Sequence, residues 1–151
     1  MPHWRLHYHL VWATKARESL IGVCEDETIR ETFGSTAHRM GLMIHAVGTM
    51  PEHVHIAISI PPKYSVAEVV RAMKGSASRF INLKSQSEAS LFRWQSEYGA
   101  LSFSDRGMAD VIDYVTNQKA RHASNELYAA LERIGEVEVG RSGMSGAKGP
   151  D

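Results

Sequence analysis

Cysteine is almost absent from this chain of 151 residues, and so is any long apolar run. The single Cys24 excludes an internal disulfide framework and fits a reducing compartment. No apolar stretch approaches the roughly 18–20 residues that a membrane span needs. The N-terminus, MPHWRLHYHL, lacks the pattern of a signal peptide. We therefore predict a soluble, cytoplasmic protein with no membrane partner.

An excess of charge of one sign is also lacking, because 17 basic residues balance 17 acidic ones. The field of the whole protein therefore does not indicate binding to nucleic acid. Residues 1–84 carry 10 basic and 7 acidic residues, a balance of +3, whereas residues 85–151 carry 7 and 10, a balance of −3. Only a local basic face could support contact with a polyanion.

Short-range patterns predict alternating strands and helices. Residues that alternate between apolar and polar indicate strands, and an apolar stripe of helical spacing after a capping box at Ser65 and Glu68 indicates a helix. In chain order we expect a strand over Arg5–Thr14, a helix over Thr28–Met40 that follows acidic Glu25–Glu27 and ends at Gly41, and strands over Leu42–Thr49 and His53–Ile60. The Ser65-capped helix, a strand over Tyr98–Phe103, a helix from Ser104 or Asp105 to about Arg121 and a helical stretch over Ser124–Ile134 should follow. Residues 135–151, rich in Gly and Ser, are predicted to be a disordered tail.

This order of elements predicts an α+β fold of the ferredoxin-like or RRM-like type. Such a fold has an antiparallel sheet with helices on one face, and here a C-terminal tyrosine-bearing helix would lie near the open face. Side chains alternate between the two faces of a strand. Val54, Ile56 and Ile58 therefore form a core face, whereas His53 and His55 point together from the open face.

The two histidines of PEHVH are candidate metal ligands. Two imidazoles a few ångströms apart suit a metal, but a divalent cation needs at least one further protein ligand to be held usefully. On the helix of DVIDYVTNQKARH, Tyr114 and Gln118 lie one turn apart on the flank of an apolar stripe, and His122 continues their row. The Gln carbonyl oxygen suits Mg²⁺ or Mn²⁺, and a phenol beside a metal suggests a nucleophile. His122 competes with Gln118 for the third position.

The other histidines and the acidic residue near these motifs are not expected to bind the metal. His7 and His9 have the spacing of the PEHVH pair but lack its Pro-Glu turn, so we expect them to be structural or close to DNA. His45 is expected to be structural. Glu52 is expected to be a turn residue. The alternative is that it contacts a metal ligand without binding the metal itself.

Four segments in order resemble one family: YHLVWATK, PEHVH with its apolar strand, WQSEYGALSFS and YVTNQ. They are similar to the HUH-superfamily transposases with a single tyrosine, the insertion-sequence-200-like group. The resemblance spans roughly residues 1–131, and we predict a transposase domain over residues 1–134. It implies an enzyme, an endonuclease and strand transferase, that cuts single-stranded DNA beside hairpins at transposon ends and rejoins it. By position, it implies Tyr114 as nucleophile, His53, His55 and Gln118 as ligands of Mg²⁺ or Mn²⁺, and a homodimer.

DNA contact is expected from local basic groups. The candidates are Lys15, Arg17, Arg71, Lys74 and Arg79, with Trp4 and Trp94 as aromatics on which bases could stack. A second hypothesis is a domesticated or inactive relative that binds hairpin nucleic acid without transposing. A third, a metal-dependent phosphoesterase that uses water, is disfavoured because the chain has no paired His-x-Thr/Ser elements.

Overall fold

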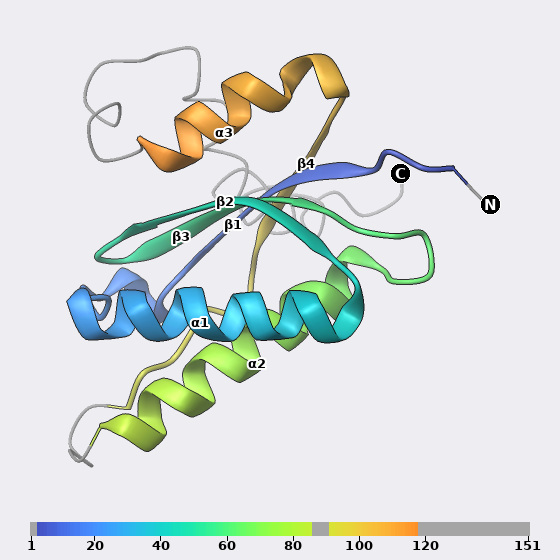
Figure 1. The fold of residues 1–151 in the computed structure, drawn as a ribbon. Coiled ribbons are helices and arrows are strands. Elements are labelled where there is room, and N and C mark those ends of the chain that lie inside the picture. The colour runs from blue at the N-terminus through green and yellow to red at the C-terminus, as the bar shows by residue number, and fades with distance from the viewer. Residues whose placement is uncertain (1–2, 86–90, 118–151) are drawn as a thin grey trace, which may run out of the picture.

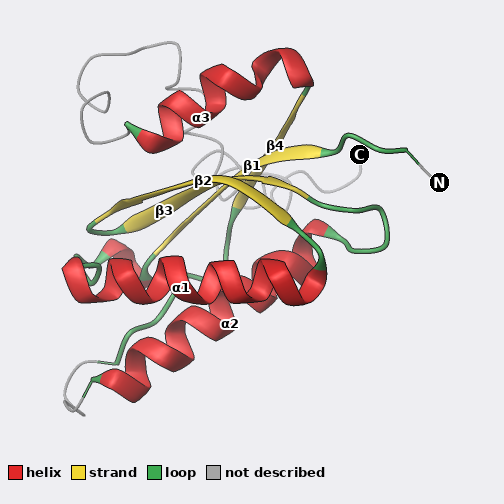
Figure 2. Ribbon diagram, viewed as in Figure 1, coloured by secondary structure: helices red, strands yellow, loops and turns green. Residues whose placement is uncertain are grey.

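The computed structural model describes residues 3–85 and 91–117 (Figure 1). Helices α1 and α2 lie on one side of a four-stranded sheet, and α3 lies on the other side (Figures 1 and 2). The elements are β1 His7–Ala13, η1 Lys15–Arg17, α1 Val23–Met40, β2 Met43–Met50, β3 His53–Ser59, α2 Val66–Lys84, β4 Gly99–Phe103, η2 Asp105–Gly107 and α3 Met108–Thr116. None of the helices in these two described ranges is long and apolar enough to cross a membrane.

The sheet confirms the predicted ferredoxin-like α+β fold. Its strand order is β2-β3-β1-β4, and all three neighbouring pairs are antiparallel. In the central pair, Val11 of β1 lies opposite His55 of β3, and Ala13 lies opposite His53. This register places the start of β3 beside the end of β1, where η1 begins.

The main core lies between the sheet and the α1/α2 layer, as the alternation in β3 predicts. Val54, Ile56 and Ile58 are fully buried there, and Leu10 and Trp12 of β1 join them. Full burial of an aliphatic side chain contributes about 1.5–3 kcal/mol. The inward face of the two central strands therefore holds the helical layer in place.

Local signals explain where the two long helices begin and end. Helix α2 starts with the predicted capping box: the Glu68 amide donates to Ser65 Oγ at 3.1 Å, and the Ser65 amide donates to the Glu68 carboxylate at 3.2 Å. Helix α1 begins at Val23, five residues before the predicted Thr28, because Glu25 accepts a hydrogen bond from the Gly22 amide at 2.9 Å. It ends at Gly41, whose φ of 71° is the left-handed conformation that glycine adopts without strain.

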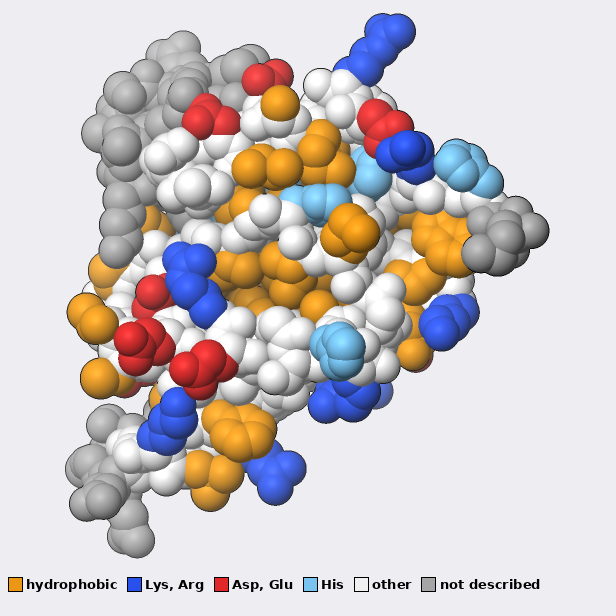
Figure 3. All heavy atoms as spheres, viewed as in Figure 1, with side chains coloured by type: hydrophobic (Ala, Val, Ile, Leu, Met, Phe, Trp, Pro, Cys, Tyr) orange, Lys and Arg blue, Asp and Glu red, His pale blue; other side chains and the backbone are white. Residues whose placement is uncertain are grey.

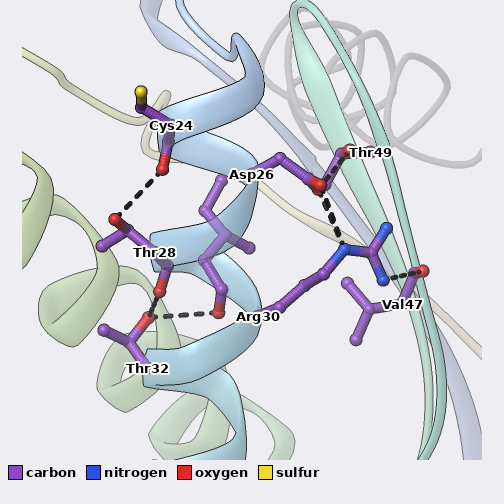
Figure 4. Close-up of polar contacts among 8 residues, drawn as sticks. Cys24, Asp26, Thr28, Arg30, Thr32, Val47 and Thr49 are labelled. Atoms are coloured by element: carbon purple, nitrogen blue, oxygen red, sulfur yellow. Dashed lines mark hydrogen bonds and ion pairs between the residues drawn. The ribbon is translucent and has the colours of Figure 1, made fainter.

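Polar contacts fasten α1 to β2 (Figure 4). The Asp26 carboxylate accepts from Thr49 Oγ1 at 2.7 Å and from Arg30 Nε at 3.0 Å. Arg30 also donates to the carbonyl oxygen of Val47 at 3.0 Å. These bonds hold α1 against the edge strand β2. The helical layer that packs on β3 is therefore fixed to the sheet at its edge.

The predicted tyrosine-bearing helix lies on the second face of the sheet, and it covers the part that carries the histidines, which was expected to be open. Helix α3 packs there, and Val111, Tyr114 and Val115 form a small buried cluster with Ala57 of β3. Tyr114 was expected on the flank of the apolar stripe but is only 2% exposed. A phenol can occupy an apolar stripe when the surface opposite offers polar rings, and imidazoles lie opposite here.

The C-terminal elements follow the prediction in part. A short 3-10 turn, η2, comes after Ser104, and the α-helix itself starts only at Met108. The side chain of Ser104 makes no capping hydrogen bond. The rest of the predicted helix, the stretch over Ser124–Ile134 and the predicted tail lie outside the described residues.

Candidate active site

The histidine pair, His53 and His55, lies side by side on β3, as the strand period predicts. Their ring centroids are 4.9 Å apart, and the residues are 3% and 0% exposed. Both rings belong to the face that α3 covers. The pair is therefore a buried feature and not a surface one.

The Nδ1 atoms of the pair are held by neighbouring side chains. His53 Nδ1 lies 3.0 Å from a carboxylate oxygen of Glu52, and His55 Nδ1 lies 2.8 Å from Nε2 of His9. A hydrogen bond at one ring nitrogen fixes the orientation of an imidazole and directs metal binding to the other nitrogen. A cation at this site would therefore meet the Nε2 atoms. Glu52 contacts a candidate ligand, which is the alternative raised for it from sequence.

Tyr114 comes to the same place from α3 of the same chain. Its ring centroid lies 5.5 Å from that of His55 and 5.9 Å from that of His9, edge-on in both cases. Two neighbours on α3 hold Tyr114 in this position: Val111, about one helical turn before it, and Val115, the next residue. Both valines are buried beside Ala57 of β3. Tyr114 therefore contacts His55, one of the two predicted ligands, within one protomer.

Gln118, the predicted third ligand, lies just beyond the described residues, as does His122, so both remain predictions. Within the described ranges, no group of three or more His, Cys, Asp or Glu residues could hold a metal. The donor set that is present, two imidazoles beside a phenol, suits a divalent cation that accepts mixed nitrogen and oxygen ligands. It is completed only if an oxygen donor such as Gln118 joins it.

His9 is the residue that sequence reasoning missed. It is 1% exposed and contacts both a candidate ligand and the candidate nucleophile. The alternation of side chains in β1 places His9 on the same face of the sheet as His53 and His55. Only the register between β1 and β3 reveals that His9 contacts His55.

Two predicted DNA-binding residues, Lys15 and Arg17, lie at the same end of the sheet as His53. The amide of Thr14 donates to the carbonyl oxygen of Glu52 at 2.8 Å, so η1 is attached to the turn that precedes the pair. Lys15 and Arg17 are both exposed. Arg17 adopts a positive φ of 53°, an uncommon conformation for a non-glycine residue.

The other predicted DNA-binding residues belong to α2, in the layer across the sheet. Arg71 and Lys74 line a groove of about 590 Å³ between α2 and residues 92–98, with Trp94 in its wall. Lys74 connects α2 to the segment that precedes β4. Its ammonium donates to the carbonyl oxygens of Gln95 at 2.7 Å and Glu97 at 3.0 Å. Burial lowers the pKa of Lys74, and the nearby Glu97 opposes this shift.

The remaining DNA-contact candidates are on the surface. Arg79 is exposed on α2, with its guanidinium 6.0 Å from the centre of the Phe80 ring. Trp4 is 44% exposed, whereas Trp94 is half-buried against Trp12. On the face shown in Figure 3, basic and acidic side chains are interspersed. This mixture agrees with the absence of net charge and leaves DNA contact to local sites.

A ferredoxin-like sheet whose buried histidine pair faces a tyrosine is the arrangement expected of a single-tyrosine transposase. Residues 2–118 match the family described as "Transposase IS200 like". The chain is 30% identical to the ISDra2 transposase TnpA of Deinococcus radiodurans over 120 residues, which cover 76% of this chain and 85% of that protein. The chain therefore belongs to the IS200-like transposase family.

Two solved structures share the fold. One, described as a transposase from Deinococcus radiodurans, is 28% identical with a TM-score of 0.58, covering 78% of this chain and 98% of that chain. The other is a REP-associated tyrosine transposase bound to a REP hairpin. It is 16% identical with a TM-score of 0.61, covering 81% of this chain and 74% of that chain.

Proposed function

We propose that this transposase is a divalent-metal-dependent enzyme that cleaves and rejoins single-stranded DNA at hairpin-flanked transposon ends through Tyr114. The observation that carries the proposal is the contact of the Tyr114 ring with His55, at 5.5 Å between centroids. Family membership supports transposition as the outcome. The REP hairpin in a structural neighbour supports hairpin DNA as the substrate.

In the proposed reaction, the phenol oxygen of Tyr114 attacks the scissile phosphorus. A bond forms between phosphorus and the phenol oxygen, and the bond to the 3′-oxygen of the departing strand breaks. The products are a 5′-phosphotyrosine and a free 3′-OH, and the phenol proton leaves to solvent or a nearby base. Because the phosphodiester energy is kept in the covalent link, a 3′-OH can reverse the step and rejoin DNA without ATP.

His53 and His55 would hold Mg²⁺ or Mn²⁺, with Gln118 as the third ligand. When bound, the cation would neutralise the scissile phosphate and stabilise the charge of the transition state. A free tyrosine has a pKa near 10, so at neutral pH the phenol must be activated by its surroundings. The rings of His9 and His55 both contact the Tyr114 ring edge-on.

DNA would reach the site along η1, where Lys15 and Arg17 lie next to the turn that leads into the histidine pair. Arg71 and Arg79 on α2 would contact phosphates at a second surface, in the layer across the sheet. Lys74 would support that surface through its two carbonyl contacts. A homodimer and a cytoplasmic location remain parts of the proposal, and light scattering would test the former.

The test is to incubate the protein with labelled single-stranded hairpin oligonucleotides and Mn²⁺, and then to separate products on denaturing gels. We expect a covalent protein–DNA adduct with the wild type and with Tyr64→Phe, a control at a half-buried tyrosine outside the site. Tyr114→Phe should form none. An adduct with Tyr114→Phe would disprove the assigned nucleophile. Hairpin binding that persists in EDTA, with no cleavage in Mg²⁺ or Mn²⁺, would favour the inactive binding module.

A further inference from the structure

A second polar cluster lies on the same face of the sheet, away from the histidine pair. His7 is the first residue of β1 and pairs with Ser59, whereas Ala13, the last, pairs with His53. Six residues of strand separate the two ends, or about 20 Å. We call this group the anchor cluster: it consists of His7, His45, Ser59 and Asp105.

The members of the anchor cluster form one connected chain of hydrogen bonds. His7 Nε2 lies 2.5 Å from Asp105 Oδ1, and His7 Nδ1 lies 2.6 Å from Ser59 Oγ. His45 Nε2 lies 2.6 Å from the same Ser59 oxygen. Arg5 adds an ion pair, with its Nε 3.3 Å from Asp105 Oδ2. Three strands and η2 are thereby joined at one point.

The chemistry of the groups assigns consistent roles to these bonds. An ionised Asp105 only accepts, so His7 donates through Nε2–H, and its Nδ1 then accepts the hydroxyl proton of Ser59. The Ser59 oxygen in turn accepts from His45 Nε2–H. The contact with His7, followed by that with Arg5, lowers the pKa of Asp105 and keeps it ionised. Burial lowers the pKa of His45 and keeps it neutral, and protonation of His7 would lower that pKa further.

Asp105 occupies the position from which α3 departs. It is the first residue of η2, and α3 begins three residues later at Met108. Phe103, at the end of β4, stacks on the ring of His7 with 5.6 Å between centroids and 30° between planes. The chain that leads into the tyrosine helix is therefore attached to β1 from two sides.

The position of Tyr114 depends on the orientation of α3 where the helix leaves Asp105. Nine residues separate Asp105 from Tyr114, a length of about 14 Å at the rise of a helix. A tilt of about 10° at the root would therefore move the tyrosine by roughly 2 Å. A misplacement of about 1 Å at a reacting group can lower a rate on the order of 100-fold.

We propose that His7 and Asp105 are positioning residues that hold the root of α3, so that Tyr114 lies beside His55. The consequence for catalysis rests on the proposed function, whereas the positional claim does not. Neither residue would contact DNA or metal. The competing interpretation is that the cluster stabilises the fold as a whole and has no particular effect on α3.

Hydrogen exchange measured by mass spectrometry separates these two interpretations. We expect Asp105→Ala and His7→Ala each to raise exchange in α3, Met108–Thr116, on the order of five-fold, while exchange in α2, Val66–Lys84, stays unchanged. The effect of the double variant on α3 exchange should be smaller than the two single effects combined, because both single variants remove the contact between His7 and Asp105. Glu27→Ala, an exposed carboxylate on α1, is the control and should leave α3 unchanged.

A conservative variant provides the rescue. Asp105→Asn keeps an oxygen that accepts from His7, so its α3 exchange should stay within about two-fold of the wild type. Asp105 is exposed, so its variants should fold even if His7→Ala does not. Unchanged exchange in α3, an equal rise in α2, or additive effects in the double variant would each overturn the proposal.

Activity gives a second readout. With Mn²⁺ affinity equal to that of the wild type, Asp105→Ala should form the covalent adduct at least ten-fold more slowly, and an unchanged rate would contradict a role in positioning Tyr114. A wild type that forms no adduct at all would disprove the proposed function, and the exchange experiment would still decide whether the anchor cluster holds α3.

Discussion

His9 offers the sharpest test of the site, because it touches a candidate ligand and the candidate nucleophile together. His9→Ala removes the 2.8 Å contact between its Nε2 and His55 Nδ1. Loss of the group that orients a metal-bound imidazole lowers metal affinity about 10–100-fold. We therefore expect the Mn²⁺ dissociation constant to rise by that factor, which corresponds to about 1.4–2.7 kcal/mol.

The assay is calorimetric titration with Mn²⁺, with thermal melting as a check that each variant folds. His9→Gln and His9→Asn form a matched pair. The Gln amide reaches about as far as Nε2 of the imidazole, whereas the shorter Asn amide does not. Gln should restore affinity to within a few-fold of the wild type, and Asn should behave like Ala. Wild-type affinity in folded His9→Ala would refute the reasoning.

Two further predictions concern stability and DNA binding. Lys74→Met should lower the free energy of unfolding by roughly 2–3 kcal/mol in urea denaturation, because two charge-assisted hydrogen bonds are lost. Arg71→Ala should leave the free energy of unfolding unchanged, but it should reduce the salt dependence of DNA binding by about one phosphate contact. Two more predictions concern the dependence of stability on pH. Because the folded pKa of His45 lies below its ordinary value of 6.5, the melting temperature should fall as pH drops below about 6.5, and His45→Gln should flatten that slope. The lowered pKa of Asp105 adds stability above its ordinary value of 3.8 that is lost as pH falls through the lower folded value, so Asp105→Asn should flatten the acid limb.

The fold was predictable because its signals are local. The alternation of Val54, Ile56 and Ile58 identifies the core face of β3 without knowledge of any partner strand. The capping box at Ser65 and Glu68 locates the start of α2 to the residue. Strand order then follows from the short connections of a split βαβ unit, so little long-range information was needed.

The contacts that give the site its chemistry were not predictable, because they depend on register. His9 meets His55 across 46 residues of sequence, and His7 meets Asp105 across 98. A shift of one residue between β1 and β3 would send both β1 histidines to the other face. No local pattern in the sequence encodes that pairing, so His7 and His9 could be assigned to a face but not to a partner.

Tyr114 shows how tertiary context changes the reading of a helix. An apolar stripe drawn through Val111 and Val115 places a polar phenol at its edge, and from sequence that is where we expected it. In the structure the imidazoles of β3 lie under α3, so the tyrosine packs inward at 2% exposure. The residue was identified from its family resemblance, whereas its burial is a property of the sheet beneath it.

Burial of the proposed nucleophile limits how DNA can reach it. Complete removal of α3 from the sheet would expose Val111, Tyr114 and Val115, at about 1.5–3 kcal/mol each, or roughly 5–9 kcal/mol together. Binding of DNA with a micromolar dissociation constant supplies about 8 kcal/mol. Detachment would therefore consume nearly all of the binding energy, so we expect α3 to stay on the sheet when DNA binds. The contacts of His7 and Asp105 at the root of α3 act in the same direction, because they hold Tyr114 beside His55.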